Sequence, residues 1–172
     1  ALATRGATTA NAFETWRAVA HQIGLTGAIR REAGWLALSV HAAEFNDLSP
    51  FRLAPFTKVN LASTQVDDLA TLKNMPLTLL DISGTRVTDL SALKGMPLTR
   101  FDAARVRAAN FTVLTGMKLI EVNLAHTSIT NLAMLKGAPL HHLQLEGCTN
   151  LVDFSPLAEC VTLEGITLPT GV

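Results

Sequence analysis

Two aspartates have the type and spacing from which acid–base chemistry is built. Asp81 and Asp102 are separated by 21 residues. Paired carboxylates can divide the roles of general acid and general base when their environments push their pKa values apart. The same interval recurs among apolar residues of this chain, so repetition of a structural unit explains the pair without catalysis. We therefore predict that this pair is not an active site.

A group of histidines is the second candidate for chemistry. Imidazole and carboxylate groups are ligands for zinc or nickel, and the candidate ligands are His126, His141, His142 and Glu146. Adjacent residues of a strand point to opposite faces, so at most part of this group can converge. Cys148 and Cys160 lack the paired spacing of a zinc site and are predicted to be buried thiols. We expect no metal and no cofactor.

Other signatures of enzymes and of common ligands are missing from the sequence. It contains no phosphate-binding glycine loop, nucleophile elbow or kinase motif, which predicts a protein that is not an enzyme. Its 14 basic residues balance its 14 acidic residues, so there is no electrostatic basis for binding nucleic acid. Apolar residues make up 48%, but no run approaches the roughly 20 residues that cross a bilayer, so we expect no membrane insertion. The compartment stays open.

The apolar residues follow a repeat of 21 residues. The fourth and sixth positions of each unit alternate with polar ones as in a half-buried strand, whereas the fourteenth and seventeenth lie on one face of a tight helical turn. The unit-opening residues, from Trp35 onward, are apolar as well and are assigned to the core. The units are 35–55, 56–76, 77–97, 98–118, 119–139, 140–162 and a partial unit 163–172.

A short polar residue precedes each helical segment. Its side chain can accept backbone N–H bonds at the start of a helical turn, so we predict a capping role. These residues are Asp47, Asp68, Asp89, Asn110, Asn131 and Asp153.

The unit resembles the leucine-rich repeat of the short bacterial subtype, with Leu77 to Leu93 as its best copy. It is similar to internalin repeats and to repeats with Thr at the ninth position that accompany bacterial signalling or kinase domains. The resemblance implies an α/β fold: a right-handed solenoid with a concave parallel β-sheet, short helical or 3₁₀ convex segments and an N-terminal helical cap. Where the family places an Asn ladder along the stack, this chain has Thr64, Thr85, Thr127 and Cys148, with interruptions at Ala43 and Val106.

The fourth unit departs most from the pattern. It carries Ala103 and Ala108 at core positions where other units have larger side chains, and Phe101 and Phe111 at others. Two rings beside two small side chains predict an exchange of volume within one layer.

The two ends of a repeat stack need covering. Residues 1–34 are predicted to form a helical cap, separate from the repeats at 35–172. Helical spacing of Phe13, Trp16, Ala20 and Ile23 predicts one helix that ends at Gly24, and a second short helix is expected at 28–33, closed by Gly34.

The last predicted strand leaves an apolar edge at the other end, since no cap follows it in the sequence. Either the chain is a segment of a larger polypeptide, or two chains associate edge to edge through the C-terminal repeat.

The predicted concave face is where a function would lie. We expect a protein or peptide partner at a polar site of mixed charge, so the chain would be a non-catalytic interaction module. The alternative is a structural, spacer or regulatory segment of a larger bacterial signalling protein. There is no Tyr, and neither Trp is expected on this face, which predicts a weak or accessory binder. The candidate site residues are Asp81, Arg100, Asp102, Glu121 and Asn123.

Overall fold

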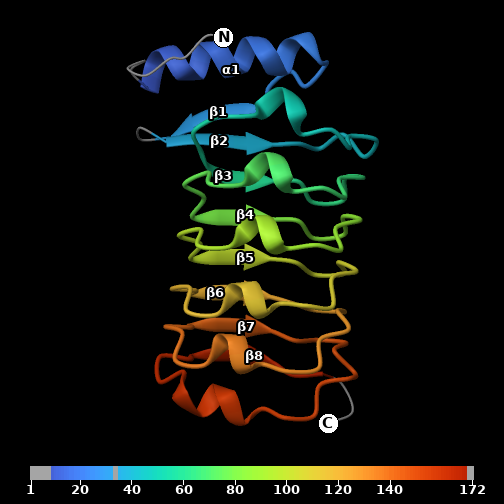
Figure 1. Ribbon diagram of the computed structural model, residues 1–172, viewed down its shortest axis with the longest axis vertical. Helices are drawn as coiled ribbons and strands as arrows, with labels where there is room; N and C mark the ends of the chain where they lie inside the picture. Colours follow the sequence, from blue (N-terminus) through green and yellow to red (C-terminus); the bar gives the residue numbers. More distant parts are fainter. Residues whose placement is uncertain (1–8, 33–34, 170–172) are drawn as a thin grey trace.

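The chain forms an elongated stack of repeats with one helix across its N-terminal end (Figure 1). The computed structural model describes residues 9–32 and 35–169. The helix α1 spans Thr9–Gln22. The strands are β1 (Ile29–Glu32), β2 (Trp35–Ser39), β3 (Phe56–Asn60), β4 (Leu79–Asp81), β5 (Arg100–Asp102), β6 (Glu121–Asn123), β7 (His142–Gln144) and β8 (Gly165–Thr167). The 3₁₀ helices are Ser49–Phe51, Ala70–Leu72, Ser91–Leu93, Thr112–Leu114, Ala133–Leu135 and Ser155–Glu159.

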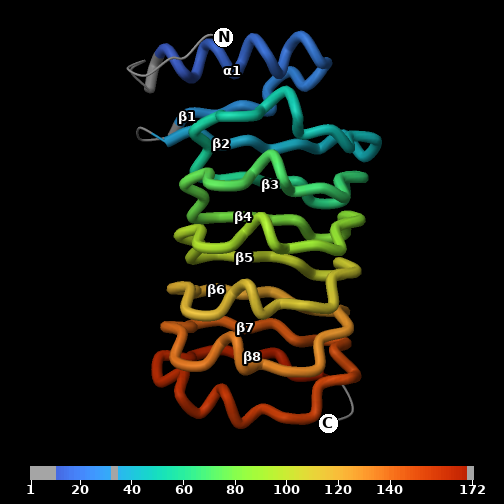
Figure 2. Tube along the Cα trace, viewed as in Figure 1, coloured from blue at the N-terminus to red at the C-terminus, as the bar shows by residue number. Residues whose placement is uncertain are grey.

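All eight strands lie in a single sheet, in the order in which they occur in the chain. β2 to β8 are parallel, and β1 pairs antiparallel with β2. Each repeat makes one turn of the chain, with its strand on one side and its 3₁₀ helix on the other (Figure 2). Residues 21 positions apart are direct neighbours, as Asp81 and Asp102 are. The predicted leucine-rich-repeat solenoid is therefore confirmed.

Backbone hydrogen bonds continue the ladder beyond the strands into the turns that follow them. The Ile82 N–H donates to the Asp102 carbonyl at 2.8 Å, and the Gly84 N–H donates to the Ala104 carbonyl at 2.8 Å. The eighth residue of the second to sixth repeats has a positive φ, which turns the chain out of the strand. These residues are Ser63, Gly84, Arg105, His126 and Gly147.

Glycine is required at one of these turns for a second reason. A Cβ atom at Gly147 would lie 2.2 Å from Nδ1 of the His126 ring, which packs on this turn from the preceding repeat. The close stacking of turns therefore selects small residues where a larger side chain lies beneath.

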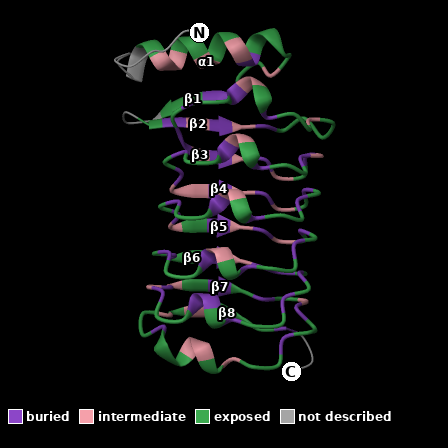
Figure 3. Cartoon of the chain, viewed as in Figure 1, coloured by how far each residue is buried: buried purple, intermediate pink, exposed green. Residues whose placement is uncertain are grey.

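The core is a column of aliphatic layers between the sheet and the 3₁₀ helices (Figure 3). The predicted core positions of the central repeats are buried, with Leu80, Ile82, Leu93 and Leu98 at 0% exposure. No helix among the described residues is both long and apolar enough to span a bilayer. Cys148 and Cys160 are buried and unpaired, as predicted.

The first repeat differs from the others at its opening residue. Trp35 is 53% exposed, so the prediction that it lies in the core is wrong. Leu36 pairs with Phe56 instead, and the register shifts between Leu36 and Ala37. This irregularity places Leu36, which is 2% exposed, in the core position and leaves the indole outside.

The predicted caps are confirmed in all six repeats. Each Asp or Asn accepts a hydrogen bond from the backbone N–H two residues later, at the start of the 3₁₀ helix. In the third repeat, Oδ1 of Asp89 lies 2.8 Å from the Ser91 N, and Oδ2 accepts from the Ser91 hydroxyl. The bond from the Ser91 N–H, followed by that from its hydroxyl, lowers the pKa of Asp89 below its ordinary value of 3.8.

The ninth-position threonines do not form a ladder along the stack. Each hydroxyl donates to the carbonyl three residues earlier in its own repeat, as from Thr85 to Ile82 at 2.6 Å. A threonine side chain is too short to satisfy that carbonyl and the next repeat together. Cys148 does contact the preceding repeat, with its Sγ 3.0 Å from the Leu124 carbonyl.

A different hydroxyl ladder joins neighbouring repeats at the second position. Thr57 donates to the Leu36 carbonyl, Thr78 to the Thr57 carbonyl and Thr99 to the Thr78 carbonyl, at 3.1–3.3 Å. The sequence analysis did not identify it, although Thr recurs there at the repeat spacing.

The N-terminal cap contains one helix followed by a strand. α1 agrees with the predicted helix; Ala20 is buried, Phe13 and Trp16 pack against the core, and Trp16 lies 6.4 Å from the Phe56 ring. Ile23, by contrast, is 41% exposed and does not belong to the packed face.

The second helix expected at 28–33 is wrong, because residues 29–32 form β1. Pairing with the free edge of β2 satisfies more backbone groups than a single helical turn could. Gly34, the predicted end of that helix, lies outside the described residues. The division of the chain at residue 34 stays a prediction.

The fourth repeat buries its two phenylalanines beside its two alanines, with Phe101 at 2%, Phe111 at 3% and Ala103 and Ala108 at 0% exposure. The rings therefore occupy the same layer in which the alanines leave room, as the sequence predicts.

We expect Phe111→Ala to destabilise the chain by about 3–5 kcal/mol, because it removes a buried ring and leaves a cavity. Chemical denaturation of this variant measures the loss, with Phe111→Leu as the control that retains most of the apolar volume. A loss below about 1 kcal/mol would contradict burial of the ring in a tightly packed layer.

The cap at Asp89 should make stability depend on pH. Because the folded state lowers the pKa of Asp89, its contribution is present above the ordinary value of 3.8 and is lost as the pH falls through the folded value. Asp89→Ala should lower the melting temperature at pH 7, whereas Asp89→Asn should keep the bond, as Asn110 does, and flatten the acid dependence.

Thermal unfolding at neutral and acid pH, followed by circular dichroism, checks this. Thr88→Ala, at an exposed neighbouring position, is the control. Equal melting temperatures for wild type and Asp89→Ala at pH 7 would show that the cap contributes nothing.

Candidate functional site

A shallow depression of about 480 Å³ lies in the middle of the sheet, on the side away from the 3₁₀ helices. We call this side the strand face. The depression brings together all five residues predicted as a site, which are Asp81, Arg100, Asp102, Glu121 and Asn123. The sequence analysis did not assign the other polar residues of its lining, Asn60, His142 and Gln144. They occupy the same third and fifth positions of neighbouring repeats, so the repeat spacing was the signal that could have found them.

Four polar side chains run across the depression as a symmetric row. Asn60, Asp81, Asp102 and Asn123 occupy neighbouring strands in direct register. The Asn60 amide donates to Oδ2 of Asp81 at 3.2 Å, and the Asn123 amide donates to Oδ2 of Asp102 at 2.9 Å. The two carboxylates thus lie side by side, with an amide on each outer side.

The same four side chains close the turns that follow the strands. Each accepts a hydrogen bond at its Oδ1 atom from the backbone N–H two residues later, at 2.9–3.0 Å. Asx side chains commonly form such turns, which explains why Asp and Asn recur here. The row is therefore a structural element first, and any binding role is added to it.

The two carboxylates have different surroundings. Asp81 also accepts the Ser83 hydroxyl at 2.7 Å, but the corresponding residue after Asp102 is Ala104, which has no hydroxyl. Partial burial raises the pKa of Asp102, and the charge of Asp81 raises it further. The Ala104 N–H and the Asn123 amide act in the opposite direction but do not cancel this effect.

The third-position residues at the edge of the depression are more exposed. Arg100 and Glu121 lie on neighbouring strands with 3.9 Å between Nη1 and Oε2, and their side chains are 52% and 48% exposed. Such a pair is too solvated to hold the sheet together and is free to exchange partners. With Asp81 and Asp102 beside them, the strand face carries an excess of negative charge.

This arrangement suits binding better than acid–base catalysis. Both Asp81 and Asp102 use their oxygens to accept hydrogen bonds from the fold itself. A general acid or base must exchange its proton with a substrate, which these bonds oppose.

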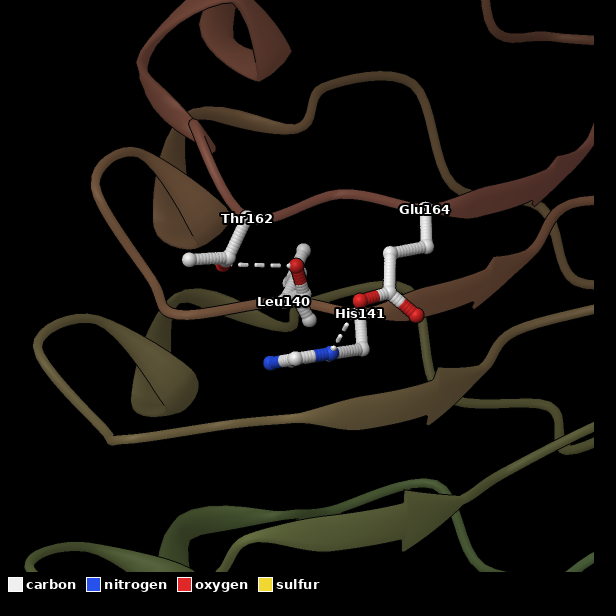
Figure 4. Close-up of polar contacts among 4 residues, drawn as sticks. All are labelled: Leu140, His141, Thr162 and Glu164. Carbon is white, nitrogen blue, oxygen red and sulfur yellow. Dashed lines mark hydrogen bonds and ion pairs between the residues drawn. The ribbon is translucent and has the colours of Figure 1, made fainter.

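The histidines considered as metal ligands lie apart. His141 forms an ion-pair contact with Glu164, with 3.1 Å between Nδ1 and Oε1, while the Thr162 hydroxyl bonds to the Leu140 carbonyl beside it (Figure 4). His142 lies in the strand-face depression, and His126 packs on Gly147. Within residues 9–32 and 35–169, no three histidine, cysteine or acidic side chains gather into a group that could hold a metal ion.

The fold can be compared with known proteins. No model of a protein family matches the sequence, and no curated protein matches it either. Among solved structures, internalin C2 from Listeria monocytogenes matches with a TM-score of 0.66 and 21% identity, covering 73% of this chain and 67% of that one. A second internalin from the same organism, inlF, matches with a TM-score of 0.64 and 19% identity, covering 73% of this chain and 38% of that one.

These likenesses concern the fold. The chain spans about two thirds of the one internalin structure and well under half of the other. The parallel sheet, the 3₁₀ helices and the helical cap agree with the same architecture. The chain is thus a leucine-rich-repeat solenoid with the fold of the bacterial internalins.

Proposed function

We propose that the chain is a non-catalytic protein–protein interaction module that binds its partner on the strand face. The observation that carries this proposal is the depression that gathers Asp81, Arg100, Asp102, Glu121 and Asn123 on four neighbouring strands. A surface mounted on a rigid sheet binds without much loss of conformational entropy, because its side chains are already positioned.

The charge of the face indicates the chemistry of the partner. Three carboxylates, those of Asp81, Asp102 and Glu121, face a single guanidinium, that of Arg100. The partner segment would therefore carry a basic side chain that lies over the two aspartates. A lysine or arginine there would also relieve the repulsion between the carboxylates.

The affinity is expected to be modest. Binding hot spots are enriched in Trp, Tyr and Arg. The aromatic side chain in the depression is that of Phe101, which is only 2% exposed and belongs to the core. The face therefore offers charge and hydrogen bonding, with little apolar surface for a partner to bury.

The strand-face site can be tested with peptides selected from a random displayed library on the wild-type chain. We expect basic residues to be enriched. The variant Arg100→Ala with Asp102→Asn should bind the selected peptides at least about tenfold more weakly by calorimetry. Asp102→Asn keeps an oxygen that can accept the Ala104 N–H, so the turn should persist.

The control is Ser39→Ala with His41→Ala, which removes a hydrogen-bonded pair at the N-terminal end of the sheet. Equal affinity of wild type and the Arg100/Asp102 variant, with folding intact, would remove the site. If no peptide is selected, a spacer or regulatory segment of a larger bacterial signalling protein becomes the better account.

Self-association through the C-terminal repeat stays a prediction. β8 is the last strand of the described sheet, and Ile166 and Leu168 are 39% and 48% exposed at positions that are buried in the inner repeats. Light scattering at micromolar concentration should show a dimer that Ile166→Lys disrupts. A wild-type monomer under these conditions would contradict the prediction.

A further inference from the structure

Three exposed arginines gather where the turns follow β4 and β5. Arg86 and Arg107 occupy the same position of consecutive repeats, and Arg105 lies two residues before Arg107. The Gly84 N–H bonds to the Ala104 carbonyl, so the turn that carries Arg105 stacks on the turn that precedes Arg86. These turns stack along one edge of the solenoid (Figure 2). We call Arg86, Arg105 and Arg107 the arginine edge.

The arginine edge has no counter-charge of its own. The ion pairs found among the described residues involve none of its three guanidinium groups. The nearby carboxylate of Asp89 bonds to Ser91 at the start of a 3₁₀ helix.

Charge on this edge is concentrated in one repeat of a neutral chain. The fourth repeat, residues 98–118, has four basic residues and one acidic residue, a formal charge of +3, whereas the whole chain has a formal charge of zero. Equivalent residues of stacked repeats lie about one strand spacing apart, roughly 5 Å, so Arg86 and Arg107 repel each other until an anion binds.

Arg105 occupies a backbone conformation that an arginine does not favour. Its φ is 61°, in the left-handed region, and the equivalent residues of the repeats on either side of this position include Gly84 and Gly147. A non-glycine residue is strained there, and nothing in the fold requires the arginine side chain, which is exposed and makes no bond within the described residues. A ligand outside the chain accounts for the combination of strain and unpaired charge.

We propose that the arginine edge binds an acidic segment of a partner protein. The guanidinium group presents its N–H donors as a planar fork that matches a carboxylate. Three such groups on two stacked turns fit two or three acidic side chains of an extended peptide. A nucleic acid fits less well, because binding of that kind draws on about six to ten phosphate contacts and the rest of the surface is not basic.

The arginine edge does not depend on the strand-face site. The strand face carries excess negative charge and the arginine edge carries positive charge, so they select opposite partner chemistry. Either surface can be lost by substitution without altering the other.

The test uses fluorescence anisotropy with a labelled octapeptide of glutamate, and with serine and phosphoserine octapeptides of the same length. The wild-type chain should bind the glutamate peptide, more weakly as salt is added, and should not bind the serine peptide. Arg86→Ala with Arg107→Ala should lower the affinity by about tenfold or more. Arg105→Gly should weaken binding as well, while its melting temperature stays equal to that of wild type or rises, because glycine relieves the backbone strain.

The matched control is Lys73→Ala with Lys94→Ala, which removes two exposed cations that follow 3₁₀ helices elsewhere on the repeats. Unchanged binding by this variant supports the arginine edge, and an equal loss would show that only net charge matters and overturn the proposal. Absence of glutamate-peptide binding would overturn it as well. Clear preference for the phosphoserine peptide would keep the site and assign it to phosphorylated segments, whereas tighter binding of single-stranded DNA than of either peptide would overturn the assignment to a protein partner.

Discussion

The structure depends on burial between repeats. One repeat of 21 residues has an apolar inner side that it cannot cover by itself, so each layer is stable only when a neighbour covers it. Leu80 and Leu93, from the strand and the 3₁₀ helix of one repeat, are both fully buried because the repeats above and below close over them. This requires every repeat to have the same length and shape. The devices that shape a repeat are therefore reproduced as faithfully as the core.

Short polar side chains supply that shape at two places. An Asp or Asn starts each 3₁₀ helix, and an Asp or Asn in the row at the strand ends closes the turn that follows. In both cases the side chain accepts a backbone N–H two residues later, which a local contact can do without help from the rest of the fold. Asp81 and Asp102 are thus explained by construction. Their position on the strand face, side by side and partly buried, is what makes them suitable for contact with a basic partner.

The fourth repeat shows how much variation this architecture tolerates. Phe101 and Phe111 take the volume that Ala103 and Ala108 give up, so the layer stays filled. Arg105 stands at a turn position that favours glycine, at a cost in backbone strain. The same repeat contributes Arg100 and Asp102 to the strand face. The most irregular layer of the stack therefore carries much of the surface to which we assign binding.

The repeat spacing by itself determined the strands, the register between them and the core positions, because identical spacing in a stack places equivalent residues side by side. It also located the polar caps and placed Asp81, Arg100, Asp102, Glu121 and Asn123 on one face. Tertiary structure decided what local patterns could not. Residues 29–32 became β1 because an unpaired edge of β2 was available, and Trp35 left the core because the register shifts beside it. The direction of the threonine bonds, the raised pKa of Asp102 and the stacking of Arg105 on the turn at Gly84 likewise depend on which groups neighbouring repeats bring into contact, and a linear sequence does not contain those distances.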